Sequence, residues 1–344
     1  MRRKRRKGGF WNIPLWCMPI LIALYAAIVS SPSFALRFDS LVGAHLRSFL
    51  SRVAALVPFS VTEWLLCALP ILLLLLFCIA VLAARSATAT QRVASLILLP
   101  AILVAGIYVL SFAAGRYTPP LEARLDLPAE APITASEVLS TASWLSGLAA
   151  DLPSPPGDSV TQAELRQAYS RAGERYGFCA NTAAAVKLTT TPLLLRLGYF
   201  GLYAFPLGEI TLAAECPDTI RTFTLAHEMA HASGFAREEE ADLVALLAAL
   251  SSGDQYLRAS VAEGILGRFL GCLAIDAPDV WREVSAGLSE GARRDLTRAG
   301  DILEEGTTAP TIAAVTPDYG RTVRLTVALY RLISAQGSMG ESIL

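Results

Sequence analysis

The sequence predicts a mainly α-helical protein in which three N-terminal transmembrane helices precede a mostly helical outer domain with a small β-hairpin or sheet. The composition is the first observation behind this prediction: of 344 residues, 53% are hydrophobic and 17% are charged, whereas about a quarter of a soluble domain is charged. The second observation is that the apolar excess is concentrated in the first third of the chain. The third is that helical patterns dominate the remainder.

The predicted transmembrane helices are three uncharged runs, which cover residues 13–30, 64–84 and 93–115. Each run has roughly the 20 residues that one bilayer crossing needs. A cleaved signal peptide is the competing interpretation of the first run, because a basic start and the small-x-small triplet Ser33-Phe34-Ala35 accompany it. The length of the run and the two spans that follow favour a retained anchor.

The distribution of Lys and Arg predicts the orientation of the spans. Residues 2–7 are all basic, which places residues 1–12 in the cytoplasm, and three spans then place residues 116–344 outside it. We therefore expect a multi-pass protein of the cell membrane with an extracytoplasmic C-terminal domain and the lipid bilayer as a partner. The net charge of −1 gives no indication of a nucleic-acid partner.

An amphipathic helix is predicted in the outer loop between the first two spans, over residues 37–58. Its apolar side chains recur at helical spacing, with Arg47 and Arg52 between them. Such a helix is expected to lie on the outer leaflet or on the outer domain.

The outer region begins with the proline-rich segment 117–132, which is typical of a linker. Aromatic and β-branched residues on both sides of Pro206-Leu207-Gly208-Glu209 predict two short strands joined by a turn within residues 199–215. Helices are predicted over residues 136–152, 161–178, 218–233, 236–251, 255–273, 278–298 and 318–336.

The chemical signal of the sequence is the pattern H-E-x-x-H. The chain has three histidines, and two of them, His227 and His231, stand four residues apart. Positions i and i+4 share one helix face, so the two imidazoles can hold one Zn²⁺ at the roughly 2.0–2.1 Å of zinc–nitrogen bonds. Glu228 would then reach a water held by the metal and act as general base and acid in the hydrolysis of a peptide bond.

A chance match on an ordinary amphipathic helix is the alternative to a metal site. The scarcity of histidine, the apolar flanks of the motif and Gly234, which permits a sharp turn after the helix, favour the metal site.

The third ligand is expected to be acidic, because catalytic zinc has three protein ligands and His45 belongs to the amphipathic helix. Helix geometry favours Glu238, which shares a face with small residues and with Asp242. Asp242 would accept the free N–H of a ligand histidine. Glu240 is the alternative, although its face is more typical of core packing.

H-E-x-x-H followed by E-x-x-A-D at 238–242 resembles the gluzincin metallopeptidases. This resemblance implies a zincin-like domain with the glutamate as third ligand and the aspartate orienting a histidine, although the gap before Glu238 is shorter than in most of those families. The whole chain resembles the DUF3810 proteins, an uncharacterised bacterial membrane family, which implies a zinc peptidase without a known substrate. The matching stretches are Val57-Pro58-Phe59-Ser60 with Glu63, residues 201–203, 208–209 and 227–242, and Tyr319-Gly320-Arg321.

The sequence thus predicts a membrane-anchored zinc peptidase with a protein or peptide substrate. A donor for the developing oxyanion is needed; Tyr319 is the chosen candidate, with Tyr203 and Tyr256 as alternatives. The strand element at 199–215 is expected to be an edge for an extended peptide or else a structural hairpin. The alternative function is a catalytically silent zinc-fold binding or sensor module of the cell envelope, which would have no need of Glu228.

Overall fold

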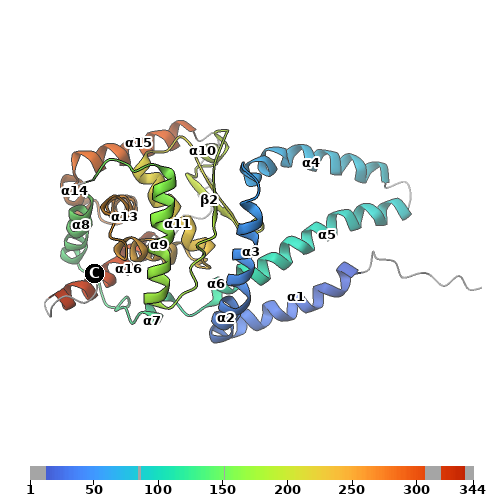
Figure 1. Ribbon diagram of the computed structural model, residues 1–344, viewed down its shortest axis with the longest axis horizontal. Helices are drawn as coiled ribbons and strands as arrows, with labels where there is room; N and C mark the ends of the chain where they lie inside the picture. Colours follow the sequence, from blue (N-terminus) through green and yellow to red (C-terminus); the bar gives the residue numbers. More distant parts are fainter. Residues whose placement is uncertain (1–12, 84–86, 151, 307–318, 338–344) are drawn as a thin grey trace, which may run out of the picture.

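The computed structural model describes residues 13–83, 87–150, 152–306 and 319–337. A helical domain with a small sheet carries long apolar helices that extend to one side of it (Figure 1). The fold is mainly α-helical, as the sequence predicts. The helices of this projection and of its base are α1 (Ile13–Ser30), α2 (Pro32–Phe38), the π-helical segment η2 (Asp39–Gly43), α3 (Ala44–Ala54), α4 (Val61–Ala83) and α5 (Ala87–Ser111).

One helix in the described part of the chain, Val61–Leu82 with a mean hydropathy of 3.2, has the length and composition of a full bilayer crossing. The pair Cys17–Ser30 and Pro32–Ala54, bent by 120°, gives a second candidate, and Ile97–Ser111 is apolar but shorter. The structure therefore supports one or two spans where the sequence predicts three. The basic segment 1–12 lies outside the described residues.

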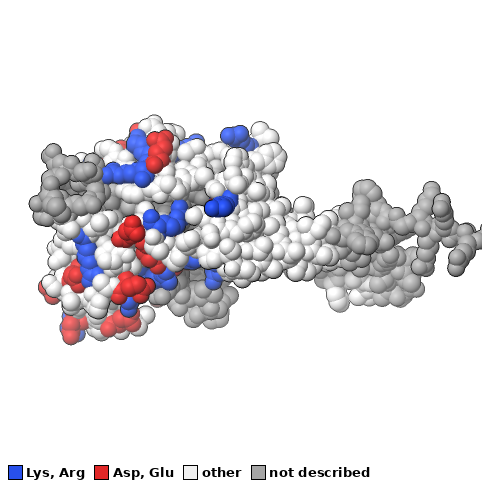
Figure 2. All heavy atoms as spheres, turned by 90° about the horizontal axis from the view of Figure 1, so that it is seen from below, with Lys and Arg blue, Asp and Glu red and all other residues white. Residues whose placement is uncertain are grey.

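The distribution of charged side chains also distinguishes the helical domain from the projection of apolar helices. Figure 2 shows Lys, Arg, Asp and Glu gathered over the helical domain, while the described surface of the projection carries none on this face. Apolar side chains on α4 are largely exposed, with Ile71 63% and Phe77 65% accessible. A soluble monomer rarely exposes so continuous an apolar surface.

The helix predicted over residues 37–58 is divided into α2, η2 and α3 and ends at Ala54. The inner face of α3 buries Arg47, Ser51 and Ala54 against the domain. Its outer face leaves Phe49 60% exposed. The predicted amphipathic character is thus present, and the polar residue Arg47 belongs to the buried face.

Arg47 joins the projection to the domain through a fully buried guanidinium. Its Nη1 and Nη2 donate to the Asp39 carboxylate at 2.6 and 3.0 Å. Nη1 also donates to the carbonyl of Ser111 at the end of α5. Nη2 donates to the carbonyl of Ser233 at 3.1 Å, directly after α11 (Asp218–Ala232).

Two carboxylates fasten α4 to the sheet. The buried Glu209 accepts hydrogen bonds from the backbone amides of Val61 at 3.2 Å and Thr62 at 3.0 Å, in the first turn of α4. A carboxylate in this position satisfies free amides and complements the helix dipole. In return Glu63 of α4 accepts from the amides of Thr190 and Thr191.

The sheet has three strands in the order β1-β3-β2. Strand β3 pairs with β1 in parallel and with β2 in antiparallel orientation. The predicted hairpin is confirmed as β2 and β3, whereas β1 was missed because four residues, one of them Lys187, form too short a pattern. The strands are β1 (Ala185–Leu188), β2 (Gly201–Ala204) and β3 (Glu209–Leu212).

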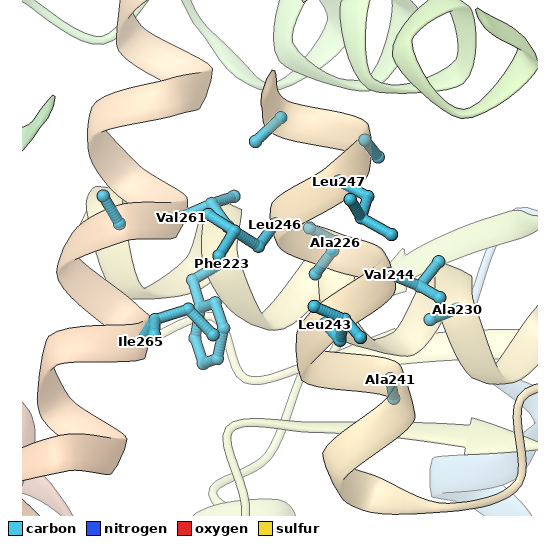
Figure 3. Close-up of a cluster of buried hydrophobic side chains, with 14 of the residues drawn as sticks. Phe223, Ala226, Ala230, Ala241, Leu243, Val244, Leu246, Leu247, Val261 and Ile265 are labelled. Carbon is cyan, nitrogen blue, oxygen red and sulfur yellow. The ribbon is translucent and has the colours of Figure 1, made fainter. Parts of the chain in front are cut away.

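The core of the domain lies between α11, α12 (Glu238–Leu250) and α13 (Gln255–Asp276). Figure 3 shows Ala226 and Ala230 of α11 beside leucine and valine side chains of α12, with the Phe223 ring next to Ile265 of α13. Phe223 packs on Gly264, where an added Cβ would lie 2.0 Å from its ring. The surrounding helices are α6 (Ala113–Tyr117), α7 (Leu121–Arg124), α8 (Ala135–Ala149), α9 (Asp158–Tyr176), α10 (Leu193–Arg196), α14 (Pro278–Ala286), α15 (Glu290–Gly306) and α16 (Tyr319–Gly337).

Two predictions for the outer region are wrong. The helix predicted over 278–298 is two helices, because the chain leaves α14 at Gly287 and Ser289 then accepts from the amide of Ala292 at 3.1 Å to open α15. The segment 117–132 is no free linker, since it contains α7 and buries Leu121 in the core.

Replacing Gly115 should strain the joint between projection and domain, because an added Cβ would lie 1.9 Å from the Gly234 carbonyl oxygen. We expect Gly115→Ala to lower the free energy of unfolding by about 1–3 kcal/mol, seen as a lower Tm. The control is Gly271→Ala inside α13, where nothing lies within 4 Å of the added Cβ, which should be neutral or stabilising. Equal losses would contradict the close contact.

The stability of the domain should depend on pH through Glu263 of α13. Burial raises the pKa of its carboxyl to about 7, although a hydrogen bond from Thr219 opposes this. Between the ordinary carboxyl pKa and pH 7 the folded state holds a proton that the unfolded state has lost. The free energy of unfolding therefore falls as pH rises through this window, by about 3 kcal/mol in total.

We expect Glu263→Gln to raise Tm at pH 8 and to leave it nearly unchanged at pH 4. The amide oxygen of glutamine can still accept from Thr219. Glu174→Gln, at an exposed position of α9, serves as the control. A shift of equal size at both pH values would show that charge on Glu263 is not the cause.

Candidate metal centre

The two histidines and the following glutamate meet because the chain reverses between α11 and α12. Gly234 takes a φ of +106°, a backbone conformation that glycine adopts readily. The amides of Gly234 and Phe235 donate to the carbonyls of His231 at 3.0 Å and Ala230 at 3.1 Å, which closes the end of α11. Glu238 then begins α12 directly opposite the histidines.

Three potential ligand atoms converge at this point. His227 Nε2 lies 3.0 Å from His231 Nε2 and 3.1 Å from Glu238 Oε2. His231 Nε2 lies 3.6 Å from Glu238 Oε1. Within the described residues these three side chains form the group whose ligand atoms all lie within 4.8 Å of one another.

The outer nitrogens of both imidazoles are committed as donors. His227 Nδ1 donates to Asp242 Oδ1 at 2.8 Å, and His231 Nδ1 donates to the carbonyl of Phe235 at 2.7 Å. In the neutral form each ring therefore directs an Nε2 lone pair at the other and at the Glu238 carboxylate. Hydrogen-bond acceptors that face one another repel unless a cation lies between them. The two nitrogens and the carboxylate are therefore a set of ligands that fits a divalent metal such as zinc.

The electrostatics of the cluster also favour a cation. Burial opposes charge on His227, but the hydrogen bonds to Asp242 and Glu238 outweigh burial and raise its pKa to about 10. Burial likewise opposes ionisation of Glu238, and its contacts with the two histidines reverse this and hold its pKa well below the usual range. Since ligand imidazoles are deprotonated, metal and proton would compete for this position.

The structure separates the two candidates for the third ligand. Glu240 is buried, and its Oε1 accepts from the amide of Leu121 at 2.9 Å and from Arg237 Nη1 at 2.6 Å. Glu240 thus holds α7 and the start of α12 together, whereas Glu238 faces the histidines. His45 lies exposed on α3.

Asp242 connects the cluster to two helices that the sequence did not associate with it. Its Oδ2 accepts from Thr322 of α16 at 2.9 Å and faces Arg268 Nε of α13 at 3.6 Å. Burial acts to raise the pKa of Asp242, but Arg268 and His227 lower it below its ordinary value. No local pattern indicates Thr322 or Arg268, although Thr322 directly follows the Tyr319-Gly320-Arg321 stretch.

Glu228 is buried beside β2. A Cβ added to Gly201 would lie 3.2 Å from Glu228 Cγ and 2.4 Å from Thr224 Cγ2, so this strand passes α11 at a distance that only glycine allows. The cluster opens to solvent at Glu238, whose side chain is 47% exposed while those of His227 and His231 are 6% and 10% exposed. Glu238 is thus the member of the cluster that faces solvent.

The oxyanion donor stays a prediction. Tyr319 begins α16, but its side chain lies outside the described residues. Tyr203 is buried against Phe112, and burial raises its pKa to about 12. Tyr256 is buried on α13, and burial raises the pKa of its phenol.

The fold and the site together define a class of mainly helical protein. Its domain holds a cluster of two histidines and one glutamate and is joined to a projection of apolar helices. Residues 42–316 match the family model "Protein of unknown function (DUF3810)", and the chain belongs to this family. No curated protein and no solved structure matches the chain. The family description names no activity, and the chemistry of this chain is indicated by the cluster itself.

Replacing Glu238 and Glu240 one at a time should show which of them is the metal ligand and which is a structural hydrogen-bond acceptor. We expect Glu238→Gln to lower zinc affinity on the order of 100-fold or more, because a charged ligand is lost. Glu240→Gln should bind zinc as the wild type does and lower the free energy of unfolding by about 1–3 kcal/mol. Competition with a chromogenic chelator and thermal unfolding measure the two effects, and the reverse pattern would make Glu240 the ligand.

Proposed function

We propose that the chain is a membrane-anchored, zinc-dependent peptidase that hydrolyses peptide bonds outside the cytoplasm. The convergence of two Nε2 lone pairs with the Glu238 carboxylate, next to the buried Glu228, is the observation that carries this proposal. His227, His231 and Glu238 would hold Zn²⁺. Bound there, the ion would supply a Lewis acid that polarises a peptide carbonyl and makes water a better nucleophile.

Glu228 is the proposed general base and acid. Among the residues that the structure describes, no hydrogen bond or ion pair occupies its carboxylate, which leaves it available to take the proton of an attacking water. It would then hand that proton to the leaving amine, as one positioned carboxylate does in both half-steps. Asp242 acts through His227, because it fixes which nitrogen of the ring carries the proton.

Strand β2 would hold the substrate as an extended chain. Ala213 N donates to Phe200 O at 2.7 Å just before β2, and hydrogen-bonded pairs alternate with free pairs in an antiparallel ladder. From the register, Gly201 and Tyr203 therefore turn their backbone groups away from β3. These groups can pair with a peptide added at the edge of the sheet.

The membrane arrangement is part of the proposal. Helices α1, α4 and α5 would all cross the bilayer, with residues 1–12 in the cytoplasm and the helical domain outside it. Their common direction away from the domain supports this (Figure 1). So does Trp64, 55% exposed in the first turn of α4, because tryptophan is enriched at membrane interfaces.

The test compares wild type with Glu228→Gln, using the full chain in detergent. We expect both to bind one equivalent of zinc, and we expect Glu228→Gln to cleave an unstructured protein about 10²–10⁴-fold more slowly. Glu174→Gln, at an exposed position of α9, is the matched control.

Each outcome of this test has a definite meaning. Equal cleavage by Glu228→Gln would remove its proposed role. Zinc in both proteins with cleavage in neither would favour the silent binding or sensor module. A folded chain without zinc would end the proposal.

A further inference from the structure

We propose that the substrate is a membrane-anchored polypeptide, cut in the segment that emerges from the bilayer. This inference rests on the proposed peptidase function and adds the class of substrate and the place of the cut. It follows from the position of the metal centre relative to α5, from the direction of β2 and from the rigidity of the joint.

The metal centre lies at the base of the projection. Phe112 directly follows α5, and its ring centroid is 6.5 Å from that of His231. The Arg47 guanidinium bonds the carbonyl that ends α5 and the carbonyl that follows α11 at the same time. One aromatic ring therefore separates a proposed zinc ligand from the end of a proposed membrane span.

The base of the projection has the surface of a membrane interface. Apolar side chains are exposed over about half of their surface or more on the segment that crosses the ends of α1, α4 and α5. Together they form a surface that would lie in the headgroup region of a bilayer. They are Leu41 73%, Phe49 60%, Val53 47%, Leu56 82% and Phe59 48% exposed.

Strand β2 leads from the proposed catalytic base to this interface. Its first residue, Gly201, abuts Glu228. Further along, Tyr203 packs against Phe112 with ring centroids 6.2 Å apart. Phe205, just after the strand, packs against Phe112 at 5.7 Å and against Tyr108, inside α5, at 5.4 Å.

An extended chain beside β2 would thus have one end at Glu228 and the other at α5. The four residue steps from Gly201 to Phe205 span roughly 13 Å at about 3.3 Å per residue. A polypeptide that leaves the bilayer next to α5 would therefore present a bond to Glu228 after only a few residues.

The joint fixes this distance. Glu209 and Glu63 fasten α4 to the sheet. Gly208, at the turn between β2 and β3, packs so closely on α3 that a Cβ added to it would lie 2.6 Å from Ser51 N. The domain cannot swing away from the membrane without breaking these buried contacts. The zinc site therefore works at one height above the bilayer.

The experiment uses the full chain in lipid vesicles with a single-span model substrate. Its outer segment is unstructured and carries two identical copies of one cleavable sequence, a proximal copy at the span and a distal copy about 30 residues further out, so that both copies are present in equal amounts in the same vesicles. Intact-mass analysis of the products reports which copy is cut. A Glu228→Gln sample of the same vesicles corrects for other proteases.

We expect the proximal copy to be cut at least about 10-fold faster than the distal copy, with the cuts within roughly ten residues of the span. Equal cutting of both copies, or preference for the distal copy, would overturn the inference while leaving the peptidase in place. No cutting of either copy, nor of a soluble unstructured protein, by zinc-loaded wild type would instead overturn the proposed function, and the inference with it.

Discussion

The burial of the Arg47 guanidinium is the constraint on which the rest of the structure depends. A buried charge is tolerated only when it is paired and hydrogen-bonded, and here the partners come from three places: Asp39, the carbonyl at the end of α5 and the carbonyl after the histidine helix. The last partner lies 186 residues away in the sequence. The hydrogen bonds of Arg47 Nη1 and Nη2 fix where the projection meets the helix that carries His227 and His231.

The parts of the site that the sequence could predict are those set by local geometry. The spacing of His227 and His231 places them on one helix face, and the face of the next helix favours Glu238 over Glu240; the structure brings these three side chains together. Thr322 and Arg268 could not be predicted, because their contacts with Asp242 join separate helices. Periodicity shows which face of a helix is apolar but not which residue it meets.

The same limit applies to the fold. Most helix ranges and the hairpin follow from patterns within a few residues, whereas β1 and the break at Gly287 do not. The uncharged run 93–115 shows why hydropathy overstates a span. The helix ends at Ser111, and the residues after it, Phe112 and Gly115, pack on the domain. The absence of charge at residues 112–115 reflects contact with protein.

The hydrogen bonds by which Glu209 and Glu63 hold α4 to the sheet have a consequence for biosynthesis. The amides that open α4 are satisfied by Glu209, which is translated 148 residues after Val61. If α4 enters a bilayer during synthesis, the amides of Val61 and Thr62 would lack this partner until β3 forms, although Ser60 can already accept from the amide of Glu63. Folding of the domain thus completes the first turn of α4, and a domain produced without α4 would bury Glu209 without the amides of Val61 and Thr62. Neither half of this protein is a finished unit by itself.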